Sequence, residues 1–343
     1  MYKNMNSLSF SPPAPTTLDG FKRRVSYLRV SLTDRCNLRC RYCMPLNGIE
    51  FFKKEEILSL NELKRLLRIF KSLGVTKIRF TGGEPLLRTD LPEIIREAVL
   101  LGVEDISLTT NALLLFSQLE KCVAAGLKRI NISLDTLRQD RFLKITGVKG
   151  LESVLNGIYR SLELGLNPVK INVVVMREWN LDEIPDFVRL AQESPLEVRF
   201  LELMPTANNF EGTAGVSLDS FVPIAEIKDC VKKVVVLNKE EEYLGVAKVF
   251  SLVNGKGKIG FISPVSNHFC ESCNRIRLTA RGELKSCLHG SDLIDLRTPL
   301  KAGASDQEIS SLIQQALLFK PEEHFIRPTH FQSQSLRMSQ VGG

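Results

Sequence analysis

The sequence lacks any apolar run close to the roughly 20 residues that a membrane-spanning helix requires. It also opens with neither a secretory signal pattern nor a clear Arg-rich, Ser-rich amphipathic leader. These absences argue against an integral membrane protein and against a secreted one. We therefore expect a cytoplasmic protein, with an organellar origin left open. Residues 1–17, with Pro12, Pro13 and Pro15, predict a disordered or draped N-terminal arm.

Charge of one sign is not gathered into any single stretch of the chain. The net charge is +7 over 343 residues, which is too diffuse for the basic stripe of a nucleic-acid-binding protein. An excess of positive charge does suit a small anionic ligand. The composition, 43% hydrophobic and 25% charged, is that of a soluble globular protein with one large domain or two smaller ones.

Six of the eight cysteines fall into two short groups, one near each end of the chain. In a reducing compartment such grouping favours metal binding over disulfide bonds. The other two, Cys122 and Cys230, lie in apolar, helix-like surroundings and are predicted to be core residues.

The first group consists of Cys36, Cys40 and Cys43, in the spacing C-x3-C-x2-C. Three thiolates this close together can hold one polynuclear metal centre from a single loop. Iron–sulfur clusters normally take four cysteine thiolates, so a cluster held by this loop alone keeps one iron open for chemistry. The alternative is a zinc site that a distant residue completes.

The second group consists of Cys270, Cys273 and Cys287, in the spacing C-x2-C-x13-C. A structural zinc site is again the alternative, because His268 and His289 lie close by in the sequence. Arg275 and Arg277 alternate on a predicted strand between the cysteines and would place two cations on one face beside the metal. A purely structural zinc site has no need of those cations.

Residues 18–205 alternate short β-rich runs with helical patterns, and glycines fall where the helices should end. Six strand–helix units predict a parallel sheet with right-handed crossovers, in an α/β fold. Because a complete barrel needs eight units, we predict a partial (β/α)6 barrel of the TIM type. The predicted strands are Tyr27–Leu32, Lys77–Thr81, Asp105–Thr110, Arg129–Asp135, Val169–Met176 and Glu197–Leu203, and the predicted helices are Leu60–Leu73, Leu91–Leu101, Phe116–Ala125, Leu151–Leu164 and Ile184–Glu193.

Residues 206–343 follow a different pattern and predict a smaller C-terminal lobe that carries the second cysteine group. A loop over residues 207–215 leads into a helix over Ser220–Val231. Short strands are predicted over Val234–Leu237, Val246–Leu252 and Lys258–Ile262, with a hairpin turn at Asn254 and Gly255.

Polar side chains recur on one face of the predicted barrel strands. Side chains alternate along a strand, so the apolar face should pack under the helices and the polar face should line an open, wet lumen. That alternation places Arg29, Arg79 and Lys170 in the lumen. Three cations there would be costly unless an anion binds among them.

Two loops follow the first two predicted strands and therefore lie at the end of the barrel where active sites form. One is the first cysteine loop, and the other is the turn of Gly82, Gly83, Glu84 and Pro85. Paired glycines allow a backbone to approach a ligand closely, and Glu84 adds a carboxylate.

The cysteine loop and the Gly-Gly-Glu-Pro turn together resemble the radical S-adenosylmethionine (SAM) enzymes. The resemblance implies that the three cysteines bind a [4Fe–4S] cluster whose open iron chelates the amino and carboxylate groups of SAM. An electron from the cluster then cleaves SAM to a 5′-deoxyadenosyl radical, which can attack an unactivated C–H bond. In this superfamily the Gly-Gly-Glu-Pro turn contacts the methionine amino group.

The second cysteine group narrows the resemblance to the GTP 3′,8-cyclases of molybdenum cofactor biosynthesis. It extends from about Leu18 to Gly343 and rests on both cysteine groups, on the sequence Cys-Asn-Arg-Ile-Arg-Leu from Cys273, and on the terminal Gly342 and Gly343. The resemblance implies a second [4Fe–4S] cluster on Cys270, Cys273 and Cys287, whose open iron contacts the guanine of GTP. It also implies that the terminal glycines reach the active site and are needed for activity.

The same resemblance assigns ligand contacts by position. The implied GTP contacts are Arg29, Arg79, Thr110, Lys170, Arg275 and Arg277, and the implied SAM contacts are Tyr42, Gly83, Ser133 and Met204. The implied reaction removes the 3′ hydrogen of GTP, joins C3′ to C8 of guanine and ends with a one-electron reduction. The implied partners are an electron donor such as flavodoxin or ferredoxin and the synthase that converts the product to the pterin precursor, with a homodimer possible.

Two alternatives stay open at this point. A peptide-modifying radical SAM enzyme would also use C-terminal cysteines for auxiliary clusters, but such enzymes tend to carry more of them. A non-catalytic binding module could hold zinc at both cysteine groups. Metal analysis separates the zinc-binding module from the cluster enzymes, because two clusters contain about eight irons and two zinc sites contain none.

Overall fold

The computed structural model describes residues 17–44, 49–204, 216–241, 245–290, 292–324, 326 and 338–342. The predicted arm lies outside the described residues except for Thr17, and so do the predicted loop at 207–215 and Gly343. Within the described residues, no helix has the length and apolar character needed to cross a membrane.

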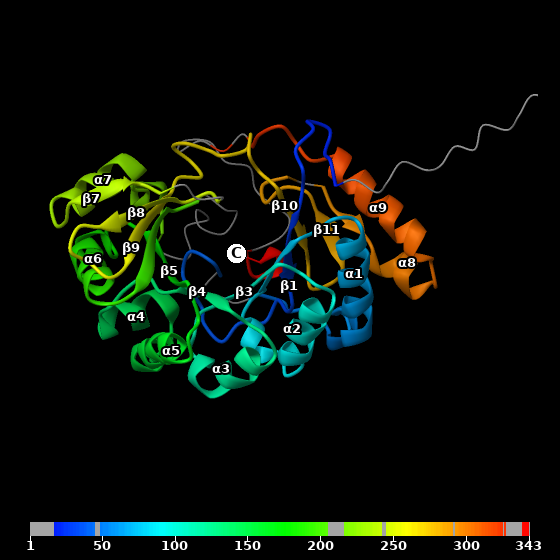
Figure 1. Ribbon diagram of the computed structural model, residues 1–343, viewed down its shortest axis with the longest axis horizontal. Helices are drawn as coiled ribbons and strands as arrows, with labels where there is room; N and C mark the ends of the chain where they lie inside the picture. Colours follow the sequence, from blue (N-terminus) through cyan, green and yellow to red (C-terminus); the bar gives the residue numbers. More distant parts are fainter. Residues whose placement is uncertain are drawn as a thin grey trace, which may run out of the picture.

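Six neighbouring parallel strands form the wall of an open barrel, with helices on its outer face (Figure 1). The strands are β1 (Tyr27–Ser31), β2 (Lys77–Thr81), β3 (Asp105–Thr110), β4 (Arg129–Ser133), β5 (Val169–Val175) and β6 (Leu196–Glu202). The helices are α1 (Leu60–Ser72), α2 (Leu91–Leu100), α3 (Leu115–Ala124), α4 (Gln139–Thr146), α5 (Leu151–Glu163) and α6 (Ile184–Glu193). The predicted partial (β/α)6 barrel is confirmed, with α4 as a helix that the sequence pattern did not indicate.

The C-terminal lobe joins the barrel at both of its edges. It contributes the strands β7 (Leu237–Glu240), β8 (Lys248–Leu252), β9 (Lys258–Ile262), β10 (Arg275–Leu278), β11 (Glu283–Lys285) and β12 (Ile294–Asp295) and the helices α7 (Ile224–Lys232), α8 (Arg297–Lys301), α9 (Asp306–Leu318) and α10 (Met338–Val341). Strand β10 pairs in parallel with β1, and β9 pairs in parallel with β6. The edge strands of an open barrel leave backbone N–H and C=O groups unpaired, and these additional strands satisfy them.

Three boundaries in the lobe differ from the prediction, one of them at β8, which was predicted from Val246 and begins at Lys248. The helix predicted from Ser220 begins at Ile224, because Pro223 precedes its first turn in an extended conformation. The strand predicted over Val234–Leu237 instead runs from Leu237 to Glu240. The strand at Lys258–Ile262 and the Arg275–Arg277 strand are where the sequence predicted them.

Local sequence explains why the barrel elements form. Helix α1 begins at Ser59, whose hydroxyl accepts from the Glu62 amide while the Glu62 carboxylate accepts from the Ser59 amide. Its buried face packs against the outward apolar face of the sheet, which includes Leu28 and Val30 of β1. The hydrophobic core therefore lies between sheet and helices, and the polar strand face is left to the lumen.

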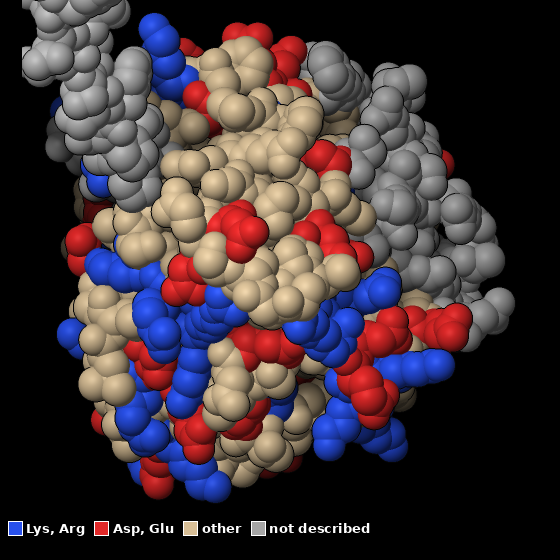
Figure 2. Space-filling view, turned by 90° about the vertical axis from the view of Figure 1, so that its right-hand side faces the viewer, with Lys and Arg blue, Asp and Glu red and all other residues tan. Residues whose placement is uncertain are grey.

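The outer face formed by α1, α8 and α9 carries both charge signs. Lys and Arg side chains lie among Asp and Glu side chains there (Figure 2). The ion pair between Arg65 of α1 and Asp306 of α9, with 2.7 Å between Nε and Oδ1, is one example. Exposed pairs of this kind contribute little to stability, but they show how the positive charge is balanced on this surface.

Candidate active site

The first cysteine loop leaves β1 and is anchored to the C-terminal end of α4. The backbone amides of Arg39 and Arg41 donate to the carbonyls of Thr146 and Ile145, at 2.8 and 3.0 Å. Cys36, Cys40 and Cys43 are free, partly buried thiols that line one cleft of the lumen. Helix α4, which the sequence did not predict, thus positions the first cysteine loop, which the sequence did predict.

The glycine turn after β2 packs directly on the cysteine loop. A Cβ atom on Gly83 would lie 2.2 Å from the carbonyl oxygen of Arg35, and one on Gly82 would lie 2.5 Å from that of Thr33. The Gly83 amide donates to the Thr33 carbonyl at 2.6 Å. The glycines are therefore needed so that two backbones can meet, and Gly83 also lines the cleft.

Glu84 does not lie in the cleft, contrary to the expectation that its carboxylate stands near the ligand. The side chain is fully buried and accepts from the Thr110 hydroxyl at 2.7 Å, the Asn111 amide at 2.8 Å and the Leu86 amide at 3.0 Å. Burial raises the pKa of Glu84 to about 7 although these hydrogen bonds favour the carboxylate. Glu84 therefore ties the end of β3 to the glycine turn.

A second buried acid lies beside the first cysteine loop. Asp135 accepts from the Tyr42 hydroxyl at 2.7 Å and from the Val174 amide at 2.8 Å, and burial raises its pKa to about 6. Burial and the neighbouring Cys36 and Asp135 raise the pKa of Cys43 to about 12. Such thiols stay protonated unless a metal cation compensates the thiolate charge, which is the behaviour of a metal-binding set.

The second cysteine loop faces the same cleft in a different electrostatic environment. Cys270, Cys273 and Cys287 line it, and the Cys273 amide donates to the Cys270 carbonyl at 3.0 Å. Burial opposes ionisation of Cys273, but the nearby Lys320 and Arg275 outweigh it and lower the pKa of that thiol. Cations therefore stabilise the thiolate at this loop before any metal is considered.

The histidines near the second loop contact one another edge to face. The ring centroids of His268 and His289 lie 5.4 and 5.0 Å from that of His324. Burial, with His324 and Arg277 nearby, lowers the pKa of His289 to about 3, so its imidazole is neutral. Among the described residues, no three His, Cys, Asp or Glu side chains gather as ligands of a single metal ion.

Strand register places the charged lumen residues in two rows across β10, β1 and β2. One row contains Arg275, Tyr27 and Lys77, and the other contains Arg277, Arg29 and Arg79. The guanidinium carbons of Arg29, Arg79 and Arg275 lie 5.6–5.9 Å from the centre of the Tyr27 ring. Burial raises the pKa of Tyr27, but the surrounding cations outweigh it and bring that pKa down to about 7.

Several polar atoms of this cation cluster have no protein partner. The Nε atoms of Arg29, Arg79 and Arg275 and the Tyr27 hydroxyl are buried without a hydrogen-bond partner among the described residues. Burial and mutual repulsion lower the pKa of Arg79 to about 9. Unsatisfied buried donors of one sign are costly, so the cluster fits an anionic ligand.

Lys170 already has an anionic partner within the protein, contrary to the expectation from strand alternation that it would need a bound anion. Its side chain is 1% exposed, and its Nζ lies 2.9 Å from Oε2 of Glu197. The same carboxylate holds Arg199 through Oε1 at 2.5 Å. A glutamate on the neighbouring strand β6 thus neutralises a cation that seemed to need a ligand, and it brings Arg199 to the cleft wall.

The C-terminal segment lies inside the barrel, where α10 is seen in the lumen (Figure 1). The Arg277 guanidinium donates to the Gly342 carbonyl, and the Ser339 backbone amide donates to Cys43. Gly342 has φ +77°, and a Cβ atom there would lie 2.5 Å from Cγ2 of Thr81. The tail thus bridges the two halves of the cleft, while Gly343 is outside the described residues.

Comparison with known proteins identifies the family. The Radical SAM superfamily model matches residues 30–191, and the Molybdenum Cofactor Synthesis C model matches residues 196–326. The GTP 3′,8-cyclase of Moorella thermoacetica is 47% identical over 328 residues, which are 95% of this chain and 99% of that protein. The chain belongs to the GTP 3′,8-cyclase family. The GTP 3′,8-cyclase of Syntrophomonas wolfei is 46% identical over 329 residues, which are 95% of this chain and 100% of that protein.

A solved structure supports the fold of this cyclase. The crystal structure of Streptococcus suis SuiB bound to S-adenosylmethionine matches with a TM-score of 0.55 and 14% sequence identity, covering 84% of this chain and 67% of that one. At that identity the match concerns the fold alone. The family resemblance drawn from the cysteine groups is confirmed, and with it the conclusion that the chain is a radical SAM enzyme.

The cofactors of this cyclase are SAM and iron–sulfur clusters, as its family requires. The donor sets fit them, because each loop offers three thiols and both loops open into the same cleft. Tyr42, Gly83, Ser133 and Met204 line the cleft as well. The described part of the site therefore has the residues to hold the cofactors and an anionic substrate together.

Sequence reasoning missed several residues of the cleft. Tyr27 and Lys77 lie two positions before Arg29 and Arg79, so strand alternation alone could have placed them on the lumen face. Arg199 on β6 was accessible by the same argument. Asp135 falls on the polar face of the predicted strand Arg129–Asp135, whereas Lys320 carried no such signal, because it lies in the segment after α9.

Proposed function

We propose that this chain cyclises GTP to (8S)-3′,8-cyclo-7,8-dihydroguanosine 5′-triphosphate, the first step of molybdenum cofactor biosynthesis. The observation that supports this most strongly is the placement of a buried, incompletely partnered cation cluster between two three-cysteine loops in one cleft. A triphosphate would neutralise these cations. One cysteine loop would then serve radical generation and the other would serve binding of the nucleotide. Family membership supports GTP as the substrate.

The first loop is the proposed site of radical generation. Cys36, Cys40 and Cys43 would hold one [4Fe–4S] cluster, and the proposed SAM contacts are Tyr42, Gly83, Ser133 and Met204. SAM and the first cluster would supply a 5′-deoxyadenosyl radical there to remove the 3′ hydrogen of GTP. Joining C3′ to C8 of guanine would then require one electron from an external reductant and one proton to give the 7,8-dihydro product. Tyr42 is oriented for this task by Asp135, and Gly83 holds the loop at its packing distance from β2.

The second loop and the cation rows are the proposed site of substrate binding. Cys270, Cys273 and Cys287 would hold the second [4Fe–4S] cluster, which orients the guanine base. The proposed GTP contacts are Arg29, Arg79, Thr110, Arg275 and Arg277. Arginine forks bind phosphate oxygens through charge-assisted hydrogen bonds, whereas the predicted contact Lys170 is buried in its pair with Glu197 and is left out of the set.

The C-terminal glycines belong to the same proposal. Arg277 contacts the Gly342 carbonyl, so the tail can place that arginine against the substrate. We assign Arg275, Arg277, Gly342 and Gly343 to the catalytic set on this ground and on the family resemblance. A glycine carbonyl can serve here because no side chain intervenes between the tail and β2.

The proposal includes partners and a compartment. The first cluster requires a one-electron donor such as flavodoxin or ferredoxin, and the product requires a separate synthase that rearranges it to the pterin precursor. A reducing, cytoplasmic compartment suits the six cleft thiols, which are all free. A homodimer is compatible with the proposal and is tested by sedimentation of the reconstituted enzyme.

An anaerobic assay tests the function. Reconstituted protein is incubated with GTP, SAM and a reductant, and we expect 5′-deoxyadenosine and a cyclised GTP product. Deuterium at C3′ of GTP should appear in the 5′-deoxyadenosine, and transfer from another position would refute the abstraction site. If neither product forms in protein that contains about eight irons, the assignment is wrong.

A further inference from the structure

Lys320 is a buried lysine that reaches the second cysteine loop from the segment after α9. Lys320 is 3% exposed, and its Nζ makes three contacts. It donates to the carbonyls of Arg275 and Ser286, both at 2.9 Å, and it lies 3.5 Å from the Cys273 sulfur. All three hydrogens of the ammonium group therefore point at the segments that carry Cys273 and Cys287.

The nearby Arg23 also contacts the second cysteine loop, but through a backbone carbonyl and not through a sulfur atom. Its guanidinium donates to the carbonyls of Cys270 and Glu322 at 2.7 Å, and its Nε pairs with Asp19 at 2.6 Å. Arg23 thus holds the loop through a backbone carbonyl and has a carboxylate partner. Among the described residues, Lys320 is the cation with a recorded hydrogen bond to a thiol of this loop.

Among the described residues, the hydrogen bonds to Cys36 of the first cysteine loop come from neutral donors, although the Arg39 charge also acts on that thiol. Cys36 accepts from the Leu38 backbone amide at 3.4 Å and from the Asn111 side-chain amide at 3.6 Å, and both donors are neutral. The buried acid Asp135 lies near that loop instead. Hydrogen bonds and charges around cluster sulfurs are among the features that set the reduction potential of an iron–sulfur cluster.

We propose that Lys320 is a positioning residue that raises the reduction potential of the cluster held by Cys270, Cys273 and Cys287. The inference rests on the proposed function, because it takes these cysteines as cluster ligands. Reduction adds one electron to the cluster and makes it more negative. A buried ammonium 3.5 Å from a ligand sulfur stabilises the reduced form more than the oxidised form.

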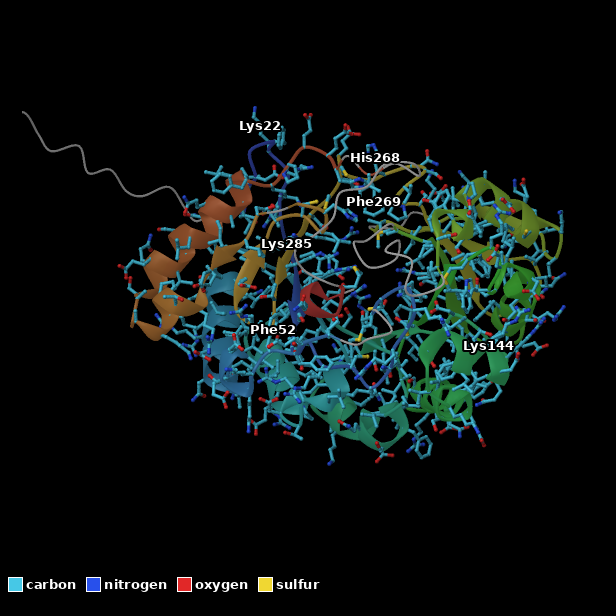
Figure 3. The ribbon with its side chains drawn as sticks, turned by 180° about the vertical axis from the view of Figure 1, so that it is seen from behind. Lys22, Phe52, Lys144, His268, Phe269 and Lys285 are labelled. Atoms are coloured by element: carbon cyan, nitrogen blue, oxygen red, sulfur yellow. The ribbon has the colours of Figure 1, made fainter. Side chains whose placement is uncertain are left out.

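The chain offers a matched control in Lys285 of β11, which is labelled in Figure 3. Lys285 is also buried, at 1% exposure, and its ammonium group donates to the Gly290 carbonyl in the loop after Cys287. Among the described residues, Lys285 has no hydrogen bond to a cysteine sulfur, although its charge interacts with Cys287 at a distance. Removing its charge therefore tests whether any buried lysine near the loop has the effect, or whether contact with sulfur is required.

The experiment is an anaerobic redox titration followed by electron paramagnetic resonance, on full-length protein with both clusters reconstituted. The variants are Lys320→Met, Lys320→Gln, Lys320→Arg and Lys285→Met. We expect Lys320→Met to shift the equilibrium of the second cluster at least tenfold toward the oxidised form, which is about 59 mV for one electron. Lys320→Gln should shift it less, Lys320→Arg by under threefold, and the first cluster should not change.

Each outcome decides the proposal. A shift of under threefold in both Lys320→Met and Lys320→Gln overturns it, and so does a shift in Lys285→Met as large as that in Lys320→Met. We expect every variant to retain about eight irons, because the thiols are unchanged and Arg23 still ties the loop. Loss of four irons from both Lys320→Met and Lys320→Gln would make Lys320 a structural tie and would also overturn the proposal.

The wild-type protein separates this inference from the proposed function. If the wild type binds only one cluster, the assignment of Cys270, Cys273 and Cys287 fails, and the proposed function fails with it. If the wild type binds two clusters and forms the cyclised nucleotide, an unchanged potential in the Lys320 variants refutes the role of Lys320 alone.

Discussion

The two cysteine loops line one cleft but differ in the charged groups beside their thiols. Around the first loop, burial and Asp135 raise the pKa of Cys40 well above its usual range. Around the second, Lys320 and Arg275 lower the pKa of Cys273, although burial raises that of Cys270. The same ligand chemistry is thus placed in an acidic half and in a cationic half, and the cationic half is the one suited to hold a triphosphate.

The difference follows from where each loop sits in the barrel. The first loop continues β1 and packs on the glycine turn of β2, so its neighbours are backbone groups and buried acids. The second loop precedes β10, an added edge strand, and the register of β10 against β1 aligns its arginines with those of the barrel. The charge difference between the parts of the cleft around the two cysteine loops would allow radical generation at the first loop and anion binding beside the second.

The largest expected effect separates the roles of the two loops. Cys40→Ala should abolish both 5′-deoxyadenosine and the cyclised nucleotide, because the first cluster is lost. Cys273→Ala should abolish the cyclised nucleotide while the first cluster remains and SAM is still cleaved slowly. Iron content and product analysis by mass spectrometry check this, and equal loss of SAM cleavage in both variants would break the comparison.

The next effect tests the cationic half. Arg29→Met should lower kcat/KM for GTP by on the order of 100-fold, because a buried charged contact with phosphate contributes roughly 2–5 kcal/mol. Arg29→Lys should recover part of the loss, since it keeps the charge without the fork. Steady-state kinetics measure both variants. A loss under threefold in Arg29→Met would show that the triphosphate binds elsewhere.

A smaller effect tests the packing of the first loop. Gly83→Ala places a methyl group 2.2 Å from the Arg35 carbonyl oxygen, so the backbone must shift at a cost of about 1–3 kcal/mol. We expect reduced occupancy of the first cluster and an intact second cluster, measured by iron content and by the two paramagnetic signals. Gly165→Ala is the control, because its Cβ would meet nothing within 4 Å, although its φ of +74° is itself strained.

The last effect is on stability alone, depends on pH, and tests the buried acid Glu84. Its pKa in the folded chain is about 7, above the ordinary value of 4.5, so folding favours the protonated form. The stabilisation it provides is therefore greatest at low pH and declines as pH rises from about 4.5 to 7, by about 3 kcal/mol. The metal-free wild type and Glu84→Gln are compared by urea unfolding at pH 5 to 8.

The difference between those two proteins carries the prediction. The free energy of unfolding of the wild type should fall relative to Glu84→Gln across this pH range, and it should become constant above it. If the difference in unfolding free energy between the two proteins stays constant from pH 5 to 8, Glu84 is ionised in the folded chain throughout. The surroundings of Glu84 would then be less apolar than its burial indicates.

Much of the barrel could be predicted from the sequence because its signals are local. Period-two and helical patterns located β2, β3 and α6 to the residue. Strand alternation placed Arg29 and Arg79 in the lumen, where the structure has them. Helix α4 escaped because it is only eight residues long and lies close before α5 in the same connection.

The errors have a common physical cause. Alternation placed Lys170 on the lumen side, but it cannot reveal that Glu197 on the next strand pairs with it. Likewise, the sequence showed a carboxylate at Glu84 but not its three donors on β3 and the turn. A side chain's face is a local property, whereas its partner depends on the register between segments far apart in the chain.

The sequence by itself determined the ligand chemistry: two sets of three cysteines, a turn with paired glycines, and arginines at alternating strand positions. Those features are set by residue type and spacing. Only the tertiary structure decided that β10 pairs with β1, that Lys320 reaches the Cys273 sulfur and that Arg277 meets Gly342. These contacts join residues 45 or more positions apart, and which of many distant partners meet depends on how the whole sheet closes.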